Sequence, residues 1–167
     1  MECAIPACVE TPAVFRVDPA GGVFADGTFT ATVFEAVSAD VAEWVLVSGP
    51  VEAGDVLELD PAAPGAYRRS RTAYSSLVAG AVASAPGVVL GGDATAGQRA
   101  LLALVGIVPV KATDEGGPIE SGDLLVSSST PGHAMRWDGS GSPALIGKAL
   151  EPMTDEIGVI LVLLTAH

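Results

Sequence analysis

Basic residues are scarce in this sequence. Its 167 residues include 8 lysines and arginines against 20 aspartates and glutamates, a formal net charge of −12. Because such a chain is repelled by phosphate backbones, we expect no nucleic acid partner. The short basic cluster Arg68, Arg69 and Arg71 carries no interleaved aromatic residues. We interpret it as a solvated strand or turn edge, with a site for an anionic partner as the alternative.

Long hydrophobic runs are also missing. The stretch 76–90 is interrupted by Gly80, Pro86 and Gly87. The run 157–165 is about half of the roughly 20 residues that a membrane-spanning helix needs. Residues 1–10 lack the basic and apolar regions of a secretory signal peptide. We therefore expect no membrane insertion and no signal peptide in this chain.

Few residues are suited to acid–base or nucleophilic catalysis. His133 and His167 are the only histidines, and Lys111 and Lys148 are the only lysines. Serines 127–129 lie close to His133 in the sequence, but the G-x-S-x-G turn that exposes a catalytic serine does not occur. A serine–lysine pair remains an alternative, because burial would depress the pKa of either lysine.

Motifs for metals and cofactors are missing as well. Cys3 and Cys8 form a C-x4-C pair without the second pair that a zinc site needs, so they are free thiols or form a local or intersubunit disulfide. The acidic loop 114–117 lacks the alternating oxygen ligands of a calcium loop. We expect no metal, no cofactor and no enzymatic activity.

Hydrophobic residues, in contrast, are abundant. They make up 49% of the chain against 17% charged residues, and the mean hydropathy is +0.48. This composition is too apolar for a disordered chain. A small domain cannot bury so much apolar surface by itself. A buried interface between subunits is the simplest explanation.

Twenty glycines and 12 prolines divide the chain into short segments, which favours an all-β fold over long helices. Asp26-Gly27 is a tight-turn signal. A single stretch, 95–105, has a helical composition. The predicted strands are 13–17, 22–25, 28–33, 43–48, 55–59, 88–90, 105–111, 123–127, 145–150 and 158–164.

The most informative feature is an internal repeat of three blocks in the same order. VEAGDVL at 51–57 recurs as IESGDLL at 119–125. PGAYR at 64–68 recurs as PGHAMR at 131–136, with one residue inserted, and LVAGAV at 77–82 parallels ALIGKA at 144–149. Three matched blocks in one order are hard to obtain by chance, so we infer a duplication.

Each repeat unit predicts the same local structure. A Gly-Asp turn starts a strand, a Pro-Gly turn follows, a strand leads to an arginine, and an apolar strand contains one glycine. The duplication predicts a small barrel or β-clip in residues 41–167, with units at about 41–92 and 105–167, preceded by an N-terminal β arm, 1–40. The structural turn residues are Gly54, Asp55, Gly122, Asp123, Gly132 and His133.

Two apolar regions are candidates for the subunit interface. The arm contains four phenylalanines, which a segment of about 40 residues cannot bury alone. The run 157–164 has no clean alternation, which predicts cover on both faces of the last strand. The predicted interface residues are Phe15, Phe24, Phe29, Phe34, Ile160, Val162 and Leu164.

Several segments resemble a known family. FRVD at 15–18, GGV at 21–23 and DGTF at 26–29 resemble the stretch that precedes the terminal domain of tail-fibre-like and surface fibre proteins. SADVAE at 38–43 resembles the entry into that domain. The most specific part is GPI-x-x-GDLL, TPGHAM and IGKAL between residues 117 and 150, which is similar to a C-terminal β domain of phage-tail-fibre-like and bacterial surface fibre proteins.

The resemblance covers residues 13–167 and implies a non-catalytic trimerising or end-capping module. We expect a homo-oligomer, a trimer, that caps or decorates a larger filament or shell, as a fibre end or a stand-alone decoration subunit in a virion or surface assembly. The resemblance also leaves a self-cleaving intramolecular chaperone as an alternative. A glycan- or receptor-binding module with Trp44 or Trp137 as its platform is a further alternative.

Overall fold

We describe a computed structural model of the chain, in which residues 15–17, 19–25, 40–91 and 97–164 are described. By its internal contacts the chain divides into two compact units, Met1–Glu35 and Ala36–His167. In the first unit β1 (Phe15–Val17) pairs with β2 (Val23–Ala25) as an antiparallel hairpin. The predicted strand 28–33 and the turn at Asp26-Gly27 lie outside the described residues.

The second unit consists of strands and one short 3-10 turn over its described residues, so the prediction of an all-β fold is confirmed. The turn is Asp114–Gly116. The strands are β3 (Val41–Val47), β4 (Val56–Leu59), β5 (Ala66–Arg69), β6 (Val78–Val82), β7 (Val88–Leu90), β8 (Arg99–Thr113), β9 (Leu124–Ser127), β10 (Ala134–Arg136), β11 (Gly147–Ala149) and β12 (Ile157–Leu164).

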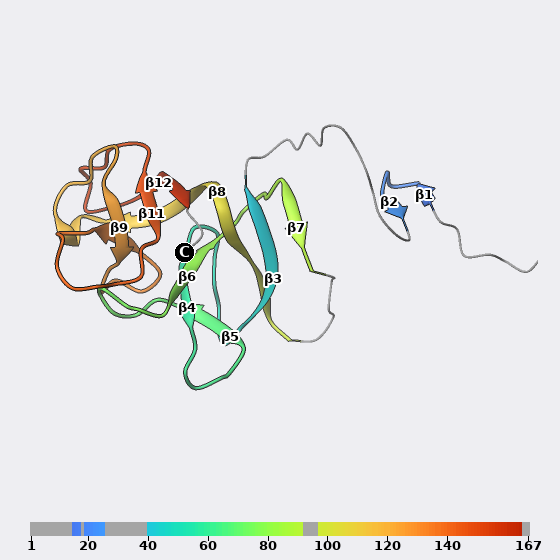
Figure 1. The fold of residues 1–167 in the computed structure, drawn as a ribbon, viewed down its shortest axis with the longest axis horizontal. Coiled ribbons are helices and arrows are strands. Elements are labelled where there is room, and N and C mark those ends of the chain that lie inside the picture. Colours follow the sequence, from blue (N-terminus) through green and yellow to red (C-terminus); the bar gives the residue numbers. More distant parts are fainter. Residues whose placement is uncertain (1–14, 18, 26–39, 92–96, 165–167) are drawn as a thin grey trace, which may run out of the picture. The chain divides into compact units, whose positions relative to one another are not determined.

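All of these strands except β7, an edge strand that pairs in parallel with β3, form two closed rings. In the first ring, β3, β5, β4 and β6 follow one another and β8 closes the ring back to β3. In the second ring, β10, β9, β11 and β12 follow one another and β8 closes it again. Figure 1 shows the second ring, in orange and red, beside the first, with β8 in yellow running between them.

The two rings have the same pairing scheme, strand for strand. Each is antiparallel throughout except for one parallel pair, β3 with β5 in the first ring and β8 with β10 in the second. Strand β8 contributes residues 99–105 to the first ring and residues 106–113 to the second. The sequence repeat therefore corresponds to two small barrels that share one long strand.

A continuous core joins the rings. One hydrophobic cluster contains Ala42, Val56 and Ala103 of the first ring together with Leu125 and Val162 of the second. A smaller cluster, with Leu57 and Leu102, fills the rest of the first ring. Because both rings contribute to one cluster, they form a single domain rather than two separate lobes.

The helix predicted at 95–105 is wrong from Arg99 onward, because β8 begins there. Alanine and leucine favour helix locally, but Ala100 and Leu102 point into the core between flanking strands. The backbone pairs of β8 with β3 and β6 outweigh the local preference. Residues 92–96 lie outside the described part of the chain.

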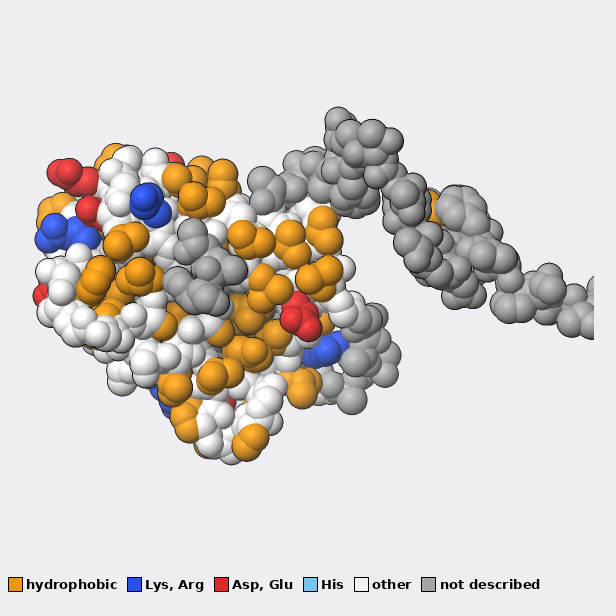
Figure 2. Space-filling model, in the orientation of Figure 1, with side chains coloured by type: hydrophobic (Ala, Val, Ile, Leu, Met, Phe, Trp, Pro, Cys, Tyr) orange, Lys and Arg blue, Asp and Glu red, His pale blue; other side chains and the backbone are white. Residues whose placement is uncertain are grey.

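The last strand alternates strictly over most of its length, and within the single chain only one of its two faces is covered. Ile160, Val162 and Leu164 are buried in the core, whereas Val159, Leu161 and Leu163 are 37–59% exposed. The outward residues are as apolar as the inward ones. The sequence of the strand therefore shows no alternation of apolar and polar residues. Figure 2 shows hydrophobic side chains spread over one face of the molecule.

Gly80 and Gly147 occupy equivalent places in the two rings. A Cβ at Gly80 would lie 2.6 Å from the carbonyl oxygen of Ala103 in β8. A Cβ at Gly147 would meet the carbonyl oxygen of Leu163 in β12. Each glycine thus permits a close backbone approach to the neighbouring strand of its ring, as expected for glycine inside a strand.

Candidate functional site

The repeat turns have nearly identical hydrogen bonds. Asp55 Oδ2 accepts the N–H of Glu52 at 2.7 Å, and Asp123 Oδ2 accepts the N–H of Glu120 at 2.9 Å. Gly54 and Gly122 have φ of 81° and 100°, which glycine adopts without strain. Each turn is thus set by local side-chain chemistry.

The two turns differ in their surroundings. The side chain of Asp55 is 1% exposed, and its Oδ1 accepts a hydrogen bond from Lys111 Nζ at 2.8 Å. Lys111 also pairs with Glu52 at 2.9 Å. Burial alone would lower the pKa of Lys111, but the hydrogen bonds to Asp55 and Glu52 outweigh it and the pKa is raised. Asp123 is only half-buried.

The turn of the second ring that contains Gly132 packs on the first ring. Val56 N–H donates to the carbonyl oxygen of Gly132 at 2.8 Å, and Gly132 N–H donates to that of Ser70 at 2.9 Å. A Cβ on Gly132 would lie 2.9 Å from Asp55 Oδ1. Three predicted turn residues, Gly54, Asp55 and Gly132, therefore meet at one junction between the rings.

The serines near His133 have structural partners. Ser127 Oγ accepts the N–H of Ser75 and donates to the carbonyl oxygen of Thr72, each at 2.9 Å, which ties a loop of the first ring to β9. His133 Nδ1 donates to the carbonyl oxygen of Pro131 at 2.9 Å, and Ser128 Oγ contacts the carbonyl oxygen of His133 rather than its ring. The described residues therefore assemble no serine–histidine pair.

The serine–lysine pair that remained an alternative is not assembled among the described residues either. Lys111 Nζ is held by two carboxylates, and its raised pKa keeps it protonated. Lys148 is exposed on β11. Among the described residues, neither lysine forms a hydrogen bond with a serine hydroxyl.

The predicted interface residues fall into three groups. Ile160, Val162 and Leu164 are at most 3% exposed in the single chain, so they stabilise the core and cannot contact another subunit; this corrects their assignment. Phe15 and Phe24 lie in β1 and β2. Phe29 and Phe34 lie outside the described residues.

The basic cluster lines a hollow of about 300 Å³. Arg68 is not a solvated edge residue: its Nε donates to the buried carboxylate of Glu58 at 3.0 Å, and its Nη1 lies 3.4 Å from Asp60. Ser75 Oγ donates to the second Glu58 oxygen at 2.8 Å. Glu58 and Asp60 were not among the residues predicted from the sequence, although two acids spaced to share one strand face opposite an arginine are a signal for such a contact.

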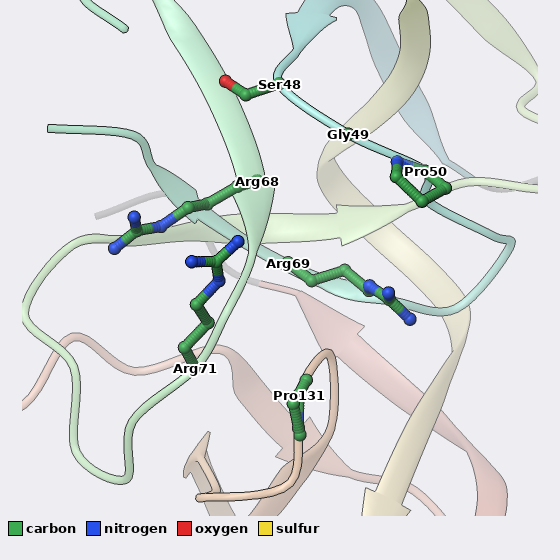
Figure 3. Close-up of a pocket in the computed structure, with 7 residues that line it drawn as sticks. All are labelled: Ser48, Gly49, Pro50, Arg68, Arg69, Arg71 and Pro131. Atoms are coloured by element: carbon green, nitrogen blue, oxygen red, sulfur yellow. The ribbon is translucent and has the colours of Figure 1, made fainter. Parts of the chain in front are cut away.

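The other two arginines of the hollow differ from Arg68 in their contacts. Arg69 and Arg71 form no ion pair with any described residue, and in Figure 3 the side chain of Arg69 extends away from the other two arginines. Two hydrogen bonds lower the pKa of Asp60. The larger effect comes from the side chain of Ser48 and the smaller one from the backbone of Ala62. The lining residues are Ser48, Gly49, Pro50, Arg68, Arg69, Arg71 and Pro131.

Other site types have little structural basis. Over the described ranges, no group of three or more histidine, cysteine, aspartate or glutamate side chains is placed to hold a metal ion. No described helix is long and apolar enough to cross a membrane. Trp137 Nε1 donates to the carbonyl oxygen of Ser140 at 2.7 Å, and both Trp44 and Trp137 are half-buried.

These features define a class of β protein: a domain of two duplicated five-stranded rings that share a strand and have a continuous core. The same fold occurs in gene product 12 of bacteriophage phi29. The chain matches the structure of its pre-mature form with a TM-score of 0.58 and 16% identity, over 90% of this chain and 24% of that one.

A second solved structure, a C-terminal fragment of the same phi29 protein, is matched over its whole length. The TM-score is 0.56 and the identity is 16%, with 75% of this chain covered. Thus the chain spans about a quarter of the pre-mature phage protein and all of the fragment. A scan against models of protein families found no match, and neither did a search of curated proteins.

Proposed function

We propose that this chain is a non-catalytic assembly protein, a homo-oligomer that caps, ends or decorates a larger filament or shell of a phage-like particle. The observation that carries the proposal is the likeness of its fold to a phage protein over 90% of the chain. The exposed hydrophobic residues of the described strands support it, because they need a partner surface.

The number of copies, the location and the partners belong to the same proposal. We propose a trimer in a virion or an extracellular surface assembly, whose partners are its own copies and the filament or shell. The charge of −12 argues against nucleic acid as a partner. Absence of catalysis is supported by the histidine and lysine contacts, since those side chains bind carbonyl oxygens and carboxylates.

The test is the native mass, measured by light scattering behind size-exclusion chromatography at micromolar concentration and after tenfold dilution. A trimer of the 16.7 kDa chain is the expected result. A monomer at both concentrations would contradict self-assembly.

A second candidate is a self-processing chaperone domain. It is favoured by the two solved forms of the phi29 protein, one described as pre-mature and the other as a C-terminal fragment. The readout is the intact mass under denaturing conditions. A 16.7 kDa chain that stays uncut, with Lys111→Ala and Lys148→Ala giving the same mass, removes this candidate. A cut chain whose processing stops in either variant would establish it.

A further inference from the structure

One outer face of the second ring is almost entirely aliphatic. Strands β12 and β8 are paired over eight residues, and directly opposite residues of such a pair share a face. Leu163 lies opposite Ile107, and Leu161 lies opposite Pro109. Val159 follows on β12, opposite Lys111. All but Lys111 are exposed.

The face extends sideways across the ring. Leu163 is also opposite Lys148 of β11, which in turn lies opposite Leu124 of β9. Leu150 N–H donates to the carbonyl oxygen of Leu161, so its exposed side chain borders the same face. We call this surface the β12 face; it consists of Ile107, Pro109, Leu124, Leu150, Val159, Leu161 and Leu163.

The size of the β12 face corresponds to half of a protein interface. Its leucine, isoleucine and valine side chains leave 37–59% of their surface uncovered. For side chains of this size that amounts to on the order of 500 Å², at the upper end of what monomers show. A standard interface buries about 800 Å² per partner, of which roughly 60% is apolar. The β12 face supplies about that apolar share.

Charge opposes the approach of another copy less at the β12 face than over a surface rich in carboxylates. The chain carries −12, so most pairs of surfaces repel each other. The β12 face itself contains no charged residue, and the two lysines, Lys111 and Lys148, lie opposite Val159 and Leu163 beside it. Of the nearby carboxylates, that of Glu151 accepts the N–H of Leu161 at 2.8 Å, and that of Glu52 forms an ion pair with Lys111. Copies can therefore meet here with little repulsion between carboxylates.

We infer that the β12 face is the surface through which copies of this chain contact one another. This inference rests on the self-assembly in the proposed function and names the surface that carries it. Further copies of the chain are the occupants that the observations favour, because each brings an identical aliphatic face and identical faces turned toward the axis of a symmetric oligomer cover one another. The exposed edge of β7 and the arginine-lined hollow of the first ring remain outside the contact.

The test compares two valine-to-glutamate variants of matched exposure. Val159 on the β12 face is 59% exposed, and Val89 on β7 of the first ring is 44% exposed. Both side chains point outward, so the fold of the single chain tolerates either change. Val159→Glu places a charge in the contact and raises the dissociation constant by roughly 100-fold or more. Val89→Glu leaves it unchanged.

The readout is light scattering of the full chain across a dilution series, with circular dichroism to check folding. Ile107→Glu, on the neighbouring strand of the same face, repeats the test should Val159→Glu not fold. Loss of the oligomer in both β12-face variants and its retention in Val89→Glu would support the inference.

The failures of the two proposals are distinguishable. If the wild-type chain is oligomeric and Val159→Glu and Ile107→Glu associate as tightly as it does, copies meet elsewhere and the inference is overturned while self-assembly stands. If the wild-type chain is a monomer at every concentration, both fall, and the β12 face belongs to a different protein of the particle.

Discussion

At the scale of single residues, the main feature is a set of buried carboxylates with dedicated partners. Asp55 is held by the Glu52 amide and by Lys111, and Glu58 is held by Arg68 and Ser75. A buried carboxylate that loses its partner keeps the cost of its lost hydration. These contacts therefore stabilise the fold, because each buried carboxylate has its hydrogen-bond and ion-pair partners.

Lys111→Met is expected to lower the free energy of unfolding by about 3 kcal/mol at pH 7, because it leaves Asp55 buried without its counter-ion. The contact of Glu52 with Lys111 lowers the pKa of Glu52, so its contribution is lost as pH falls below about 4. The raised pKa of Lys111 means that its contribution is lost only above about pH 10.

The difference between wild type and Lys111→Met should thus be largest between about pH 5 and 10 and shrink on either side. Urea unfolding at a series of pH values measures it. Lys148→Met is the matched control, since Lys148 is exposed, and it should change stability by less than about 0.5 kcal/mol. A difference that does not depend on pH would contradict the role of the ion pair.

Gly147→Ala is expected to destabilise the domain by about 3 kcal/mol, because the added Cβ meets the Leu163 carbonyl oxygen and must push two paired strands apart. Thermal unfolding provides the measurement. Gly49→Ala is the control, because nothing lies within 4 Å of a Cβ at that position. An equal effect in both variants would show that backbone entropy, not the close approach, governs these glycines.

At the scale of elements, β12 has two functions on its two faces. Its inward residues complete the core, and its outward residues Val159, Leu161 and Leu163 belong to the β12 face. The same hydrophobic run therefore stabilises the single chain and offers the proposed contact to other copies. This explains why the sequence of the strand shows no clean alternation although its structure alternates.

Val162→Ala removes two methyl groups from a fully buried position in β12 and should cost about 2 kcal/mol of unfolding free energy. Val89→Ala on the exposed edge strand β7 is the same chemical change at 44% exposure and should cost less than about 0.5 kcal/mol. Chemical denaturation of both variants tests this. Similar losses in the two would mean that β12 is not part of the core.

At the scale of the whole molecule, the shared strand couples the two rings. Residues 99–105 of β8 complete one ring and residues 106–113 the other, so neither ring is closed without this strand. Additional hydrogen bonds from Ser127 and Gly132 join loops of the two rings. Such a domain should unfold as one cooperative unit despite its duplicated topology.

Two tryptophans allow the coupling to be tested ring by ring. Trp44 lies on β3 of the first ring, and Trp137 follows β10 of the second. Fluorescence of Trp44→Phe and Trp137→Phe in guanidinium chloride then reports each ring separately. For each variant, the fraction unfolded is calculated from fluorescence and from circular dichroism. The two curves should coincide in both variants. An intermediate with one ring unfolded would contradict the coupling.

The sequence by itself determined the all-β class, the duplication and the two Gly-Asp turns, because these depend on local chemistry. Glycine at positive φ and an aspartate that accepts the backbone N–H three residues before it need no distant partner. The sequence likewise predicted a close backbone approach at Gly80 and Gly147.

Only the tertiary structure decided how the duplicated units are joined and which side of β12 faces the core. A run in which both faces are apolar carries no period, so burial of Ile160 and exposure of Val159 follow from pairing with β8. Two sets of contacts join strands and turns that are separated in the chain. Arg68 pairs with Glu58, and Asp55 contacts Lys111 and Gly132. Local sequence cannot encode them alone, because their energy exists only once the rings have closed.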